Sequence, residues 1–515
     1  MKSPNVLLIR PPGCFSRTKV GSTTGIPPSG IAYLAAYLRQ KDIPVRILDA
    51  FGENPRQITP YGDKHNIFGL TIEQITERIP GEVNVIGISC MFSNEWFFVK
   101  ELINRIKERF PDTVLVLGGE HATALPKYNM ESCDALDYIV LGEGEVKFYK
   151  LLECLFYGEN GIEKIKGIAY RSQDDIIVNA APDRLRDLDS LPLPAWDLIP
   201  VETYLKEGLA TIFSKEKRIM PLLASRGCPY KCKFCSNAVM WGNPYILRDH
   251  RKVVEEIKQY KRDYAITGFE LYDLTFITSK SYVVNFCKLL IQEGLDLKWN
   301  IPSTRAEAID EEVVHYLQKS GCTNICLTPD TGSDFQVKDM DKRVDLKKMT
   351  STVRMLLRNG IILKVNLVIG FPNERHRHIL KTILYGMKLA MLGVNSVIFY
   401  RFVPYPGSVY FEELQRNGRL PRFGPEFDRF LSINTYNELV DVYSFSKHVS
   451  NFSMRMYLFS GYILSMAAYI LTHPLATLKI FKNIRKGRAD SQIETLLIHL
   501  LSVLNRKRGS KGELH

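Results

Sequence analysis

The chain has 515 residues, of which 45% are hydrophobic and 24% charged, and its mean hydropathy is −0.10. These values are typical of a folded protein and exclude a disordered or low-complexity chain, and at roughly 150 residues per domain the length predicts two to four domains. The formal charge of +12 is uneven, because residues 479–515 contain nine Lys or Arg against three Asp or Glu. Such a basic tail attracts anionic surfaces, whereas the rest of the chain is too nearly balanced to predict nucleic-acid binding.

Short apolar runs alternate with helical patterns over residues 1–155. Strands are expected at residues 6–9, 45–48, 85–89, 114–117 and 138–141, and helices at 31–39 and 95–110. This alternation predicts an α/β fold with a doubly wound parallel sheet, which binds ligands at the carboxyl ends of its strands. The loops at those ends carry glycines, which let the backbone approach a large ligand closely. Two of these loops contain Gly118, Gly119 and His121, and Gly142, Glu143 and Gly144.

A connector is expected over residues 156–214, with a hairpin at 165–170 and 176–179 and a proline-stiffened crossing at 191–196. A second alternating region follows over residues 215–410. Its strand candidates are residues 220–224, 269–271, 299–301, 325–327, 363–369 and 397–402. Six β/α repeats predict a full or partial barrel, with the chemistry on the loops that follow the strands.

Residues 411–515 are expected to form a helical C-terminal region. Residues 456–471 carry no charge, but a membrane-spanning helix needs about 20 residues. A buried helix is the favoured interpretation, and an interfacial helix beside the basic tail is the alternative. Because Arg10 and two prolines interrupt the first apolar run, no signal peptide is predicted. We therefore expect a cytoplasmic protein, membrane-associated if the helix is interfacial, whose ten cysteines serve metal or redox chemistry before disulfides.

Three cysteines are clustered directly after the first strand of the second region. Cys228, Cys232 and Cys235 have the spacing C-x3-C-x2-C, and Gly227 and Pro229 favour the turn that would bring them together. Structural zinc generally takes four ligands in two pairs, and no second pair lies nearby. A [4Fe–4S] cube accepts four ligands, so three cysteines leave one iron open for a non-protein ligand. The cube is favoured over zinc and over three unrelated buried cysteines.

This loop, with Phe234 immediately before its third cysteine, resembles that of the radical S-adenosylmethionine (SAM) superfamily. Residues 299–305, 321–333, 366–374 and 404–408 resemble later motifs of that superfamily. Residues 30–38, 117–121 and 141–145 resemble the cobalamin-binding domain of the large subgroup in which that domain precedes the radical domain. The resemblance covers residues 5–410.

The resemblance implies three cofactors: a [4Fe–4S] cluster on the three cysteines, SAM and cobalamin. The open iron would bind the amino and carboxylate groups of SAM, and one electron from the cluster would cleave SAM to methionine and a 5′-deoxyadenosyl radical. An external donor of the flavodoxin or ferredoxin type would supply that electron. The residues implied to lie around SAM are Phe234, Asp273, Ser303, Arg305, Asp330 and, beside the adenine, Gly370. Asp330 departs from the family pattern, which often has Glu at this position.

Cobalamin would lie between the two domains, at the carboxyl edge of the first sheet, in contact with the two glycine loops. Corrinoid carriers often supply an axial histidine from a D-x-H-x-x-G motif. The sequence from Asp63 through His65 to Gly69 places the glycine one position too late and follows the second strand, so we interpret it as accidental. His121 is predicted to line the corrin pocket, and no histidine is expected on the cobalt.

The resemblance favours a C-methyltransferase that acts at an unactivated carbon of a small-molecule or lipid-like substrate. A radical cyclase or oxidoreductase is an alternative, because enzymes of this architecture also catalyse those reactions. A methylthiotransferase would need a second cluster, for which Cys14, Cys90 and Cys133 are eligible, although Cys133 falls in a helix-like stretch. A non-catalytic corrinoid carrier is the third alternative, but it has no use for a cluster with an open iron.

Overall fold

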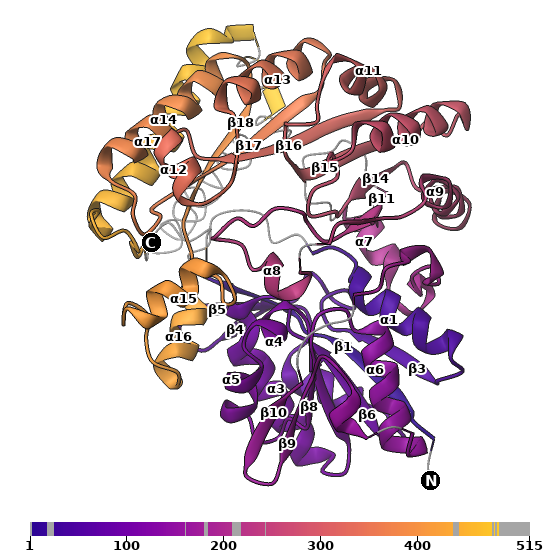
Figure 1. Ribbon diagram of the computed structural model, residues 1–515. Coiled ribbons are helices and arrows are strands. Elements are labelled where there is room, and N and C mark those ends of the chain that lie inside the picture. Colours follow the sequence, from indigo (N-terminus) through magenta and orange to yellow (C-terminus); the bar gives the residue numbers. More distant parts are fainter. Residues whose placement is uncertain are drawn as a thin grey trace, which may run out of the picture.

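The computed structural model describes residues 3–17, 25–159, 161–179, 184–208, 218–242, 244–435, 442–475, 478 and 482–483. Residues 209–214 of the predicted connector and most of the basic tail lie outside these ranges. Figure 1 shows two α/β units, one at each end of the molecule, with strands β1 to β10 (residues 6–178) in one and strands β11 to β18 (residues 219–401) in the other.

The first unit is a seven-stranded sheet in the order β10-β9-β8-β7-β6-β1-β3. Its strands are β1 (Val6–Arg10), β3 (Val45–Asp49), β6 (Val85–Ser89), β7 (Val114–Gly118), β8 (Tyr138–Val140), β9 (Ile168–Ser172) and β10 (Asp175–Val178). The five predicted strands are confirmed and run parallel. Because β1 lies between β3 and β6, the chain reverses direction across the sheet at β1, which is where such folds open a ligand crevice.

Helices cover both faces of this sheet, and each face has its own apolar core. The helices are α1 (Ser29–Gln40), α2 (Ile72–Glu77), α3 (Trp96–Arg109), α4 (Glu120–Ala124), α5 (Pro126–Ser132) and α6 (Glu145–Leu152). A small antiparallel sheet of β2 (Gly13–Ser16), β4 (Ile58–Tyr61) and β5 (His65–Phe68) lies beside them.

The predicted hairpin forms, but it belongs to the first sheet. Strand β9 pairs antiparallel with β8, with Tyr170 opposite Tyr138, and β10 becomes the sheet edge. Burial of Ile168 and Ala169 explains this position, because β8 would otherwise expose an unpaired edge. The rest of the connector leads through α7 (Val201–Glu207) to the second unit.

The second unit is a sheet of six parallel strands in chain order, and all six predicted strands are confirmed. They are β11 (Ile219–Leu222), β14 (Gly268–Leu271), β15 (Lys298–Thr304), β16 (Cys322–Asp330), β17 (Ile362–Ile369) and β18 (Ser396–Arg401). Helices α9 (His250–Tyr264), α10 (Lys280–Gln292), α11 (Glu311–Lys319), α12 (Asp334–Asp339), α13 (Leu346–Arg358) and α14 (His376–Met391) lie between successive strands. Since β11 and β18 remain at opposite edges of the described sheet, the barrel is partial.

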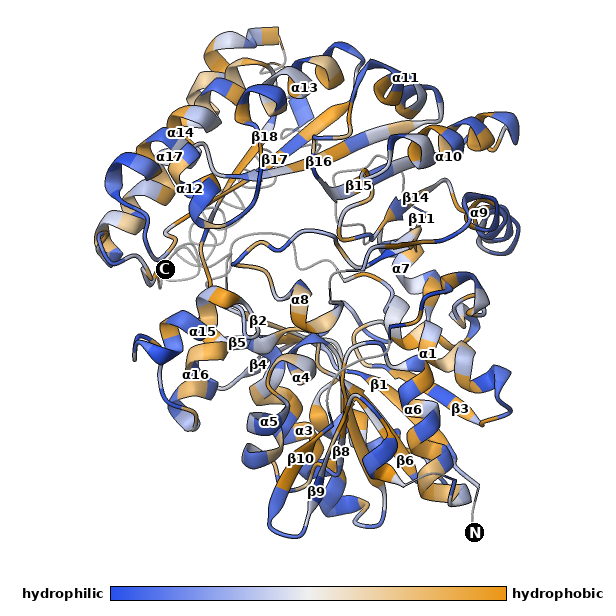
Figure 2. Cartoon of the chain, in the orientation of Figure 1, coloured by the Kyte–Doolittle hydropathy of each residue, from blue (hydrophilic) through white to orange (hydrophobic). Residues whose placement is uncertain are grey.

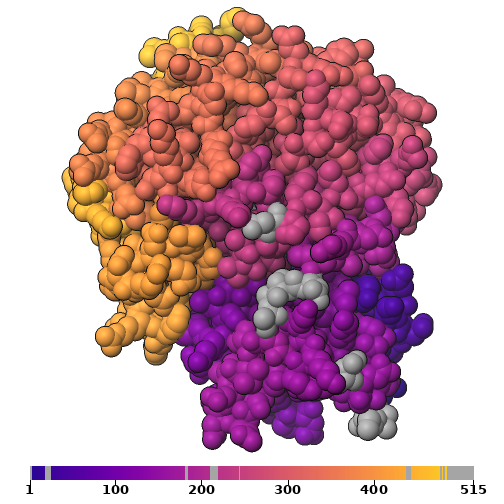
Figure 3. Space-filling view, viewed as in Figure 1, coloured from indigo at the N-terminus to yellow at the C-terminus, as the bar shows by residue number. Residues whose placement is uncertain are grey.

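The C-terminal helices pack on different units: α15 (Val409–Arg416) and α16 (Pro425–Ile433) on the first and α17 (Asn451–Thr472) on the second. The contact of α15 and α16 with the first unit includes Tyr128, which stacks on Phe423 with ring centroids 4.7 Å apart (Figure 3). Helix α17 packs on α14 and β18. By length and composition α17 could cross a membrane, with a mean hydropathy of 1.2 over its most apolar window, but a third of that window is buried inside the protein.

Candidate active site

The cysteine loop leaves the carboxyl end of β11 through a short strand, β12 (Ser225–Arg226), which pairs with β13 (Ile246–Leu247). Gly227 has φ +86°, and a Cβ there would lie 2.2 Å from the carbonyl oxygen of Pro244, so only glycine fits. The backbone N–H of Lys233 donates to Met340 O at 3.1 Å, and that of Tyr410 donates to Lys233 O at 3.1 Å. The loop is therefore held by the end of α12 in the radical unit and by α15 of the C-terminal region.

Cys228, Cys232 and Cys235 are free and of intermediate exposure. Burial raises the pKa of all three thiols, that of Cys235 to about 12, and the pKa is raised further at Cys232 by Cys228 and at Cys235 by both other cysteines. Among the described residues no three His, Cys, Asp or Glu side chains surround one ion position. A [4Fe–4S] cube takes thiolates as ligands, and three of them on one loop would leave its fourth iron open, so this donor set suits the cube.

Two cations face the cysteine loop. The Arg305 guanidinium lies 3.7 Å from the ring centroid of Tyr230, between the first two cysteines, and Lys342 Nζ lies 5.6 Å from the Phe234 ring. Lys342 also forms a buried ion pair with Asp330. Burial raises the pKa of Asp330, and the positive charge of Lys342 opposes that rise. The structure thus brings Phe234, Arg305 and Asp330 together around the loop, as the sequence predicted for a shared site.

Asp273 and Ser303 have different surroundings. The Asp273 carboxylate accepts hydrogen bonds from Ser225 Oγ and, at 3.2 Å, from Ala224 N, and burial raises its pKa to about 6. It therefore fixes the turn that leads into the cysteine loop. Ser303 is half-buried in β15, two residues before Arg305.

The predicted adenine position, Gly370, lies at the end of β17 with φ +94°. A Cβ at Gly370 would lie 2.7 Å from Met454 Cε, so α17 reaches into this edge of the site. Glu374 accepts from the backbone N–H groups of Gly370 at 2.6 Å and Phe371 at 3.2 Å. Its burial raises its pKa to about 8.

Several buried polar atoms at the carboxyl ends of β15, β16 and β17 have no hydrogen-bond partner among the described residues. They are Arg305 Nη1, Ser333 Oγ, Asn366 Oδ1, Glu374 Oε1 and both amide atoms of Gln336. Unsatisfied groups of this kind are costly unless a ligand completes them. A cation beside neutral donors and acceptors suits the carboxylate, amino and ribose groups of SAM, so the residues present fit this cofactor.

The glycine loops of the first unit lie against the cysteine loop. Gly119 has φ +107°, and a Cβ there would lie 2.5 Å from Cys90 O, so the loop packs tightly on the end of β6. Beside it, Glu120 accepts a hydrogen bond from Ser236, the residue after the third cysteine. A Cβ on Gly142, which has φ +69°, would lie 3.1 Å from Met240 O in α8 (Asn237–Met240). Gly118 and Gly144 have more space, with the nearest atoms 4.0 Å from such a Cβ.

His121 and Glu143 are both engaged within the protein. His121 is 1% exposed, its Nδ1 lies 2.9 Å from Ser93 Oγ, and burial lowers its pKa to about 3. The imidazole is therefore neutral, and it packs against the Trp96 ring, with ring centroids 5.3 Å apart. The Glu143 carboxylate accepts from Arg184 Nε at 2.8 Å and Arg226 Nη1 at 3.2 Å.

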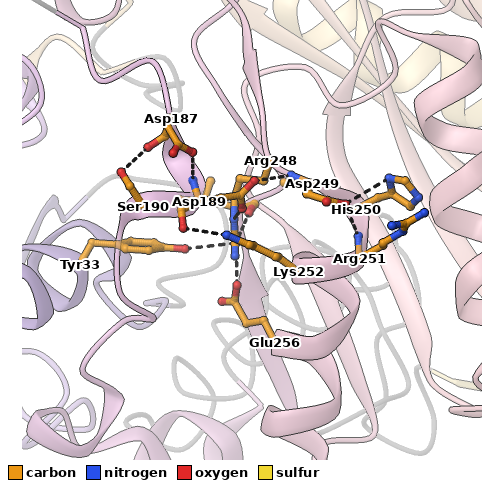
Figure 4. Close-up of polar contacts among 12 residues, drawn as sticks. Tyr33, Asp187, Asp189, Ser190, Arg248, Asp249, His250, Arg251, Lys252 and Glu256 are labelled. Carbon is orange, nitrogen blue, oxygen red and sulfur yellow. Dashed lines mark hydrogen bonds and ion pairs between the residues drawn. The ribbon is translucent and has the colours of Figure 1, made fainter.

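Buried ion pairs join the two units around these loops. Arg226 pairs with Glu145 at 2.7 Å as well as with Glu143, and it stacks 5.0 Å over the Tyr33 ring of α1. Arg248 reaches the same tyrosine, with Nη1 3.5 Å from Tyr33 Oη, and binds Glu256 at 2.6 Å (Figure 4). Helix α1, the connector and the cysteine-loop strand thus meet in one polar interface.

His65, the histidine of the sequence that resembles the D-x-H-x-x-G motif, lies in the small antiparallel sheet. It is 7% exposed, and its Nε2 is 3.0 Å from Ser432 O in α16. Its ring also packs on Phe97, with centroids 4.7 Å apart. The residue attaches the small sheet to the C-terminal helices.

Lys342, Tyr230, Arg226 and Met454 were not predicted as site residues. Tyr230 and Arg226 lie inside or beside the cysteine motif, so their positions were visible in the sequence. Lys342 approaches from the segment after α12 and Met454 from α17, and only the fold brings them to the site.

The chain matches two known families. Residues 20–152 match the B12 binding domain, and residues 222–385 match the Radical SAM superfamily. An uncharacterized methyltransferase of Pyrococcus horikoshii is 27% identical over 82% of this chain and 85% of its own length. Cytidylyl-2-hydroxyethylphosphonate methyltransferase of Streptomyces wedmorensis is 26% identical over 80% of this chain and 82% of its own. The methyltransferase TsrM of Kitasatospora setae, solved with cobalamin and a [4Fe–4S] cluster, has a similar fold, with a TM-score of 0.64 and 18% identity over 82% of this chain and 80% of that one.

The fold and the two matches define a radical SAM enzyme with a cobalamin-binding domain. Its B12 binding domain precedes its radical SAM domain, and its cofactors are those of the two families, cobalamin and SAM with an iron–sulfur centre. The predicted fold class is confirmed.

Proposed function

We propose that the chain uses a [4Fe–4S] cluster on Cys228, Cys232 and Cys235 to cleave SAM, and that it methylates an unactivated carbon of a small-molecule or lipid-like substrate. The observation that carries the proposal is the position of the three thiols. Their loop lies between Arg305 and Lys342 on one side and the Glu120 loop of the cobalamin-binding domain on the other. A methyl group carried on cobalamin and a radical formed from SAM would thus meet at one interface. The methyltransferase names of two relatives support the reaction class.

In this proposal the chain's residues bind, orient and exclude water. Arg305 Nη1, buried without a partner among the described residues, would hold the carboxylate of SAM, and Ser333 and Gln336 would satisfy its polar groups. The adenine would lie along the backbone at Gly370, against which Met454 also packs. Bound SAM supplies the 5′-deoxyadenosyl radical once the cluster is reduced, and the buried walls of β15–β17 would keep water from that radical.

His121 offers no cobalt ligand in this proposal, because it is buried against Trp96 and Ser93. Asp273 and Glu143 would act as positioning residues, since their carboxylates hold the cysteine loop and the domain interface. The remaining loop residues, Gly118, Gly119, Gly142 and Gly144, would shape the corrin surface through their backbone. An external flavodoxin- or ferredoxin-type protein would donate the electron. Ten free cysteines suit a reducing compartment such as the cytoplasm.

The test is anaerobic reconstitution with iron, sulfide and hydroxocobalamin, followed by assay of 5′-deoxyadenosine and methylcobalamin. We expect both products from the wild-type protein. Cys232→Ala should abolish 5′-deoxyadenosine while cobalamin absorption remains, because the two cofactors have separate attachment sites. Cys154→Ala, which removes another free cysteine of intermediate exposure, is the matched control and should leave both products unchanged.

Cleavage of SAM by Cys232→Ala would overturn the cluster assignment. Formation of 5′-deoxyadenosine without methylcobalamin at any SAM concentration would favour the radical cyclase or oxidoreductase over methyl transfer. Two clusters without cobalamin would indicate a methylthiotransferase, and cobalamin without a cluster a corrinoid carrier.

A further inference from the structure

The outer surfaces of α14 and α17 form an exposed apolar face, here called the α14–α17 face. The two helices pack along each other at one side of the radical unit, and apolar residues occur along both (Figure 2). Ile463 is 56% exposed, Leu384 62% and Phe452 72%. The face consists of Leu384, Met391, Phe452, Met456, Phe459 and Ile463.

The spacing along α17 makes this exposure a continuous stripe. Phe452, Met456, Phe459 and Ile463 follow at intervals of four, three and four residues, which places them on one side of a helix. The opposite side, with Met454 and Leu458, is already buried on α14 and β18. A surface helix of a soluble protein is normally polar on its outer side, so a helix that is apolar on both sides indicates a second apolar environment.

The charges around the face have one sign. Neither α14 nor α17 contains an Asp or Glu. Exposed Arg377, Lys381 and Lys388 follow one side of α14, and Arg455 lies beside the α17 stripe. A basin at the start of α14 is lined by Arg375, His376, Arg377 and His448. After α17 the sequence continues into the basic tail, with its nine Lys or Arg.

We propose that the α14–α17 face docks on the surface of a bilayer that contains anionic phospholipid. Apolar side chains would enter the headgroup–acyl boundary, and the flanking cations would pair with lipid phosphates. Because the inner side of α17 is packed on β18 and α14, the helix lies in the interface and does not span the membrane. This inference does not rest on the proposed reaction.

Docking would also bring the radical site to the membrane. Met454, on the buried side of α17, contacts the Gly370 edge of the predicted SAM site. The same helix would therefore have one side on the bilayer and the other against the Gly370 edge of the site.

The experiment is flotation of the full-length protein with vesicles of phosphatidylcholine alone or with one-third phosphatidylglycerol. Binding is expected to the anionic vesicles, to weaken with added salt because ions screen the cations, and to be far weaker on phosphatidylcholine alone. Ile463→Glu should lower partition into anionic vesicles at least about tenfold, because it removes apolar burial and introduces a charge of the wrong sign.

Ile58→Glu is the matched control, since Ile58 is also 56% exposed but lies on β4 of the first unit, and it should bind vesicles as the wild type does. Cobalamin retention and the melting temperature of both variants verify their folding. Equal binding of Ile463→Glu and wild type would overturn the proposal, as would equal binding to the two vesicle types. A dimer that Ile463→Glu dissociates, without vesicle binding by the wild type, would assign the face to a second copy of the chain.

Discussion

Lys342 and Asp330 form an ion pair that is almost completely excluded from solvent beside the cysteine loop. Asp330 is also held at φ +61°, an unusual conformation for a residue other than glycine, so its side chain is fixed by both backbone and partner. Such pairs contribute little net stability, but removal of one member leaves an uncompensated charge.

We therefore predict that Lys342→Met destabilises the apo-protein by about 3–5 kcal/mol, and that Asp330→Asn in the same chain restores most of the loss. Urea unfolding of the two single variants and the double variant measures this. Lys280→Met is the control, because Lys280 pairs with Asp310 in an exposed position and its replacement should leave the stability nearly unchanged. Equal effects of Lys342→Met and Lys280→Met would refute the prediction.

Glu374 predicts a pH dependence of stability. Its pKa is raised by burial to about 8, so between pH 4.5 and 8 the folded state holds a proton that the unfolded state releases. Its contribution to stability is complete below pH 4.5 and is lost as the pH rises through this window. Glu374→Gln stays neutral at every pH, and the decline should become shallower by on the order of 2–4 kcal/mol.

Urea unfolding of the apo-protein at pH 5, 6, 7 and 8 measures this dependence. All other titrating groups are common to the two proteins, so the difference between their pH profiles isolates Glu374. Parallel profiles would contradict the prediction.

At the residue scale, the sequence predicted contacts between residues close together in the chain better than contacts between residues far apart in it. The cysteine spacing and Gly227 define the loop within eight residues, and Arg305 and Asp330 lie near it as the resemblance implied. Glu143 was expected beside a corrinoid but is engaged by Arg184 and Arg226. That pairing joins residues far apart in the chain, and no local pattern contains it.

Helix α17 is apolar on two sides, one packed on α14 and β18 and the other exposed on the α14–α17 face. Its inner side approaches β18 so closely that a Cβ on Gly461 would lie 2.9 Å from the Phe399 ring. Gly461→Val should push the helix away from the sheet and lower the melting temperature by several degrees, consistent with about 1–3 kcal/mol of overpacking. Leu464→Val, which places the same side chain on the exposed side of α17, should have a much smaller effect. Thermal unfolding of both variants tests this, and equal shifts would show that Gly461 is not a contact glycine.

At the element scale, the hydrophobic periodicity and the length of the apolar runs were enough to predict the eleven parallel strands of the two large sheets. They did not assign the β9–β10 hairpin to the first sheet, because pairing with β8 depends on which edge is open. The sequence favoured a buried helix for α17 over an interfacial one, and the structure buries one side of it and exposes the other. Composition could not distinguish these sides, since both are apolar.

At the scale of the whole molecule, the attachment of the two units to each other depends on the buried ion pairs of Arg226. Replacement by Met would leave Glu143 and Glu145 buried with less positive charge, and we predict a loss of about 3–5 kcal/mol together with weaker cobalamin retention. Urea unfolding and gel filtration of cobalamin-loaded protein measure the two effects. Arg39→Met is the control, because it breaks an exposed ion pair with Asp197 of the connector, and it should cost about 0–1 kcal/mol. A loss of stability at Arg226 no greater than at Arg39 would show that the buried network does not hold the units together.

Arg226 lies only two residues before the first cysteine, so its ion pairs with the first unit also fix the start of the cysteine loop. A fragment that begins at β11 would retain the three thiols of the cysteine loop. It would lack Glu143 and Glu145, the carboxylates that orient the strand leading into that loop. The corrinoid module is therefore part of the scaffold of the radical centre, and exchange of that module between related enzymes should succeed only when the acidic partners of this arginine are transferred with it.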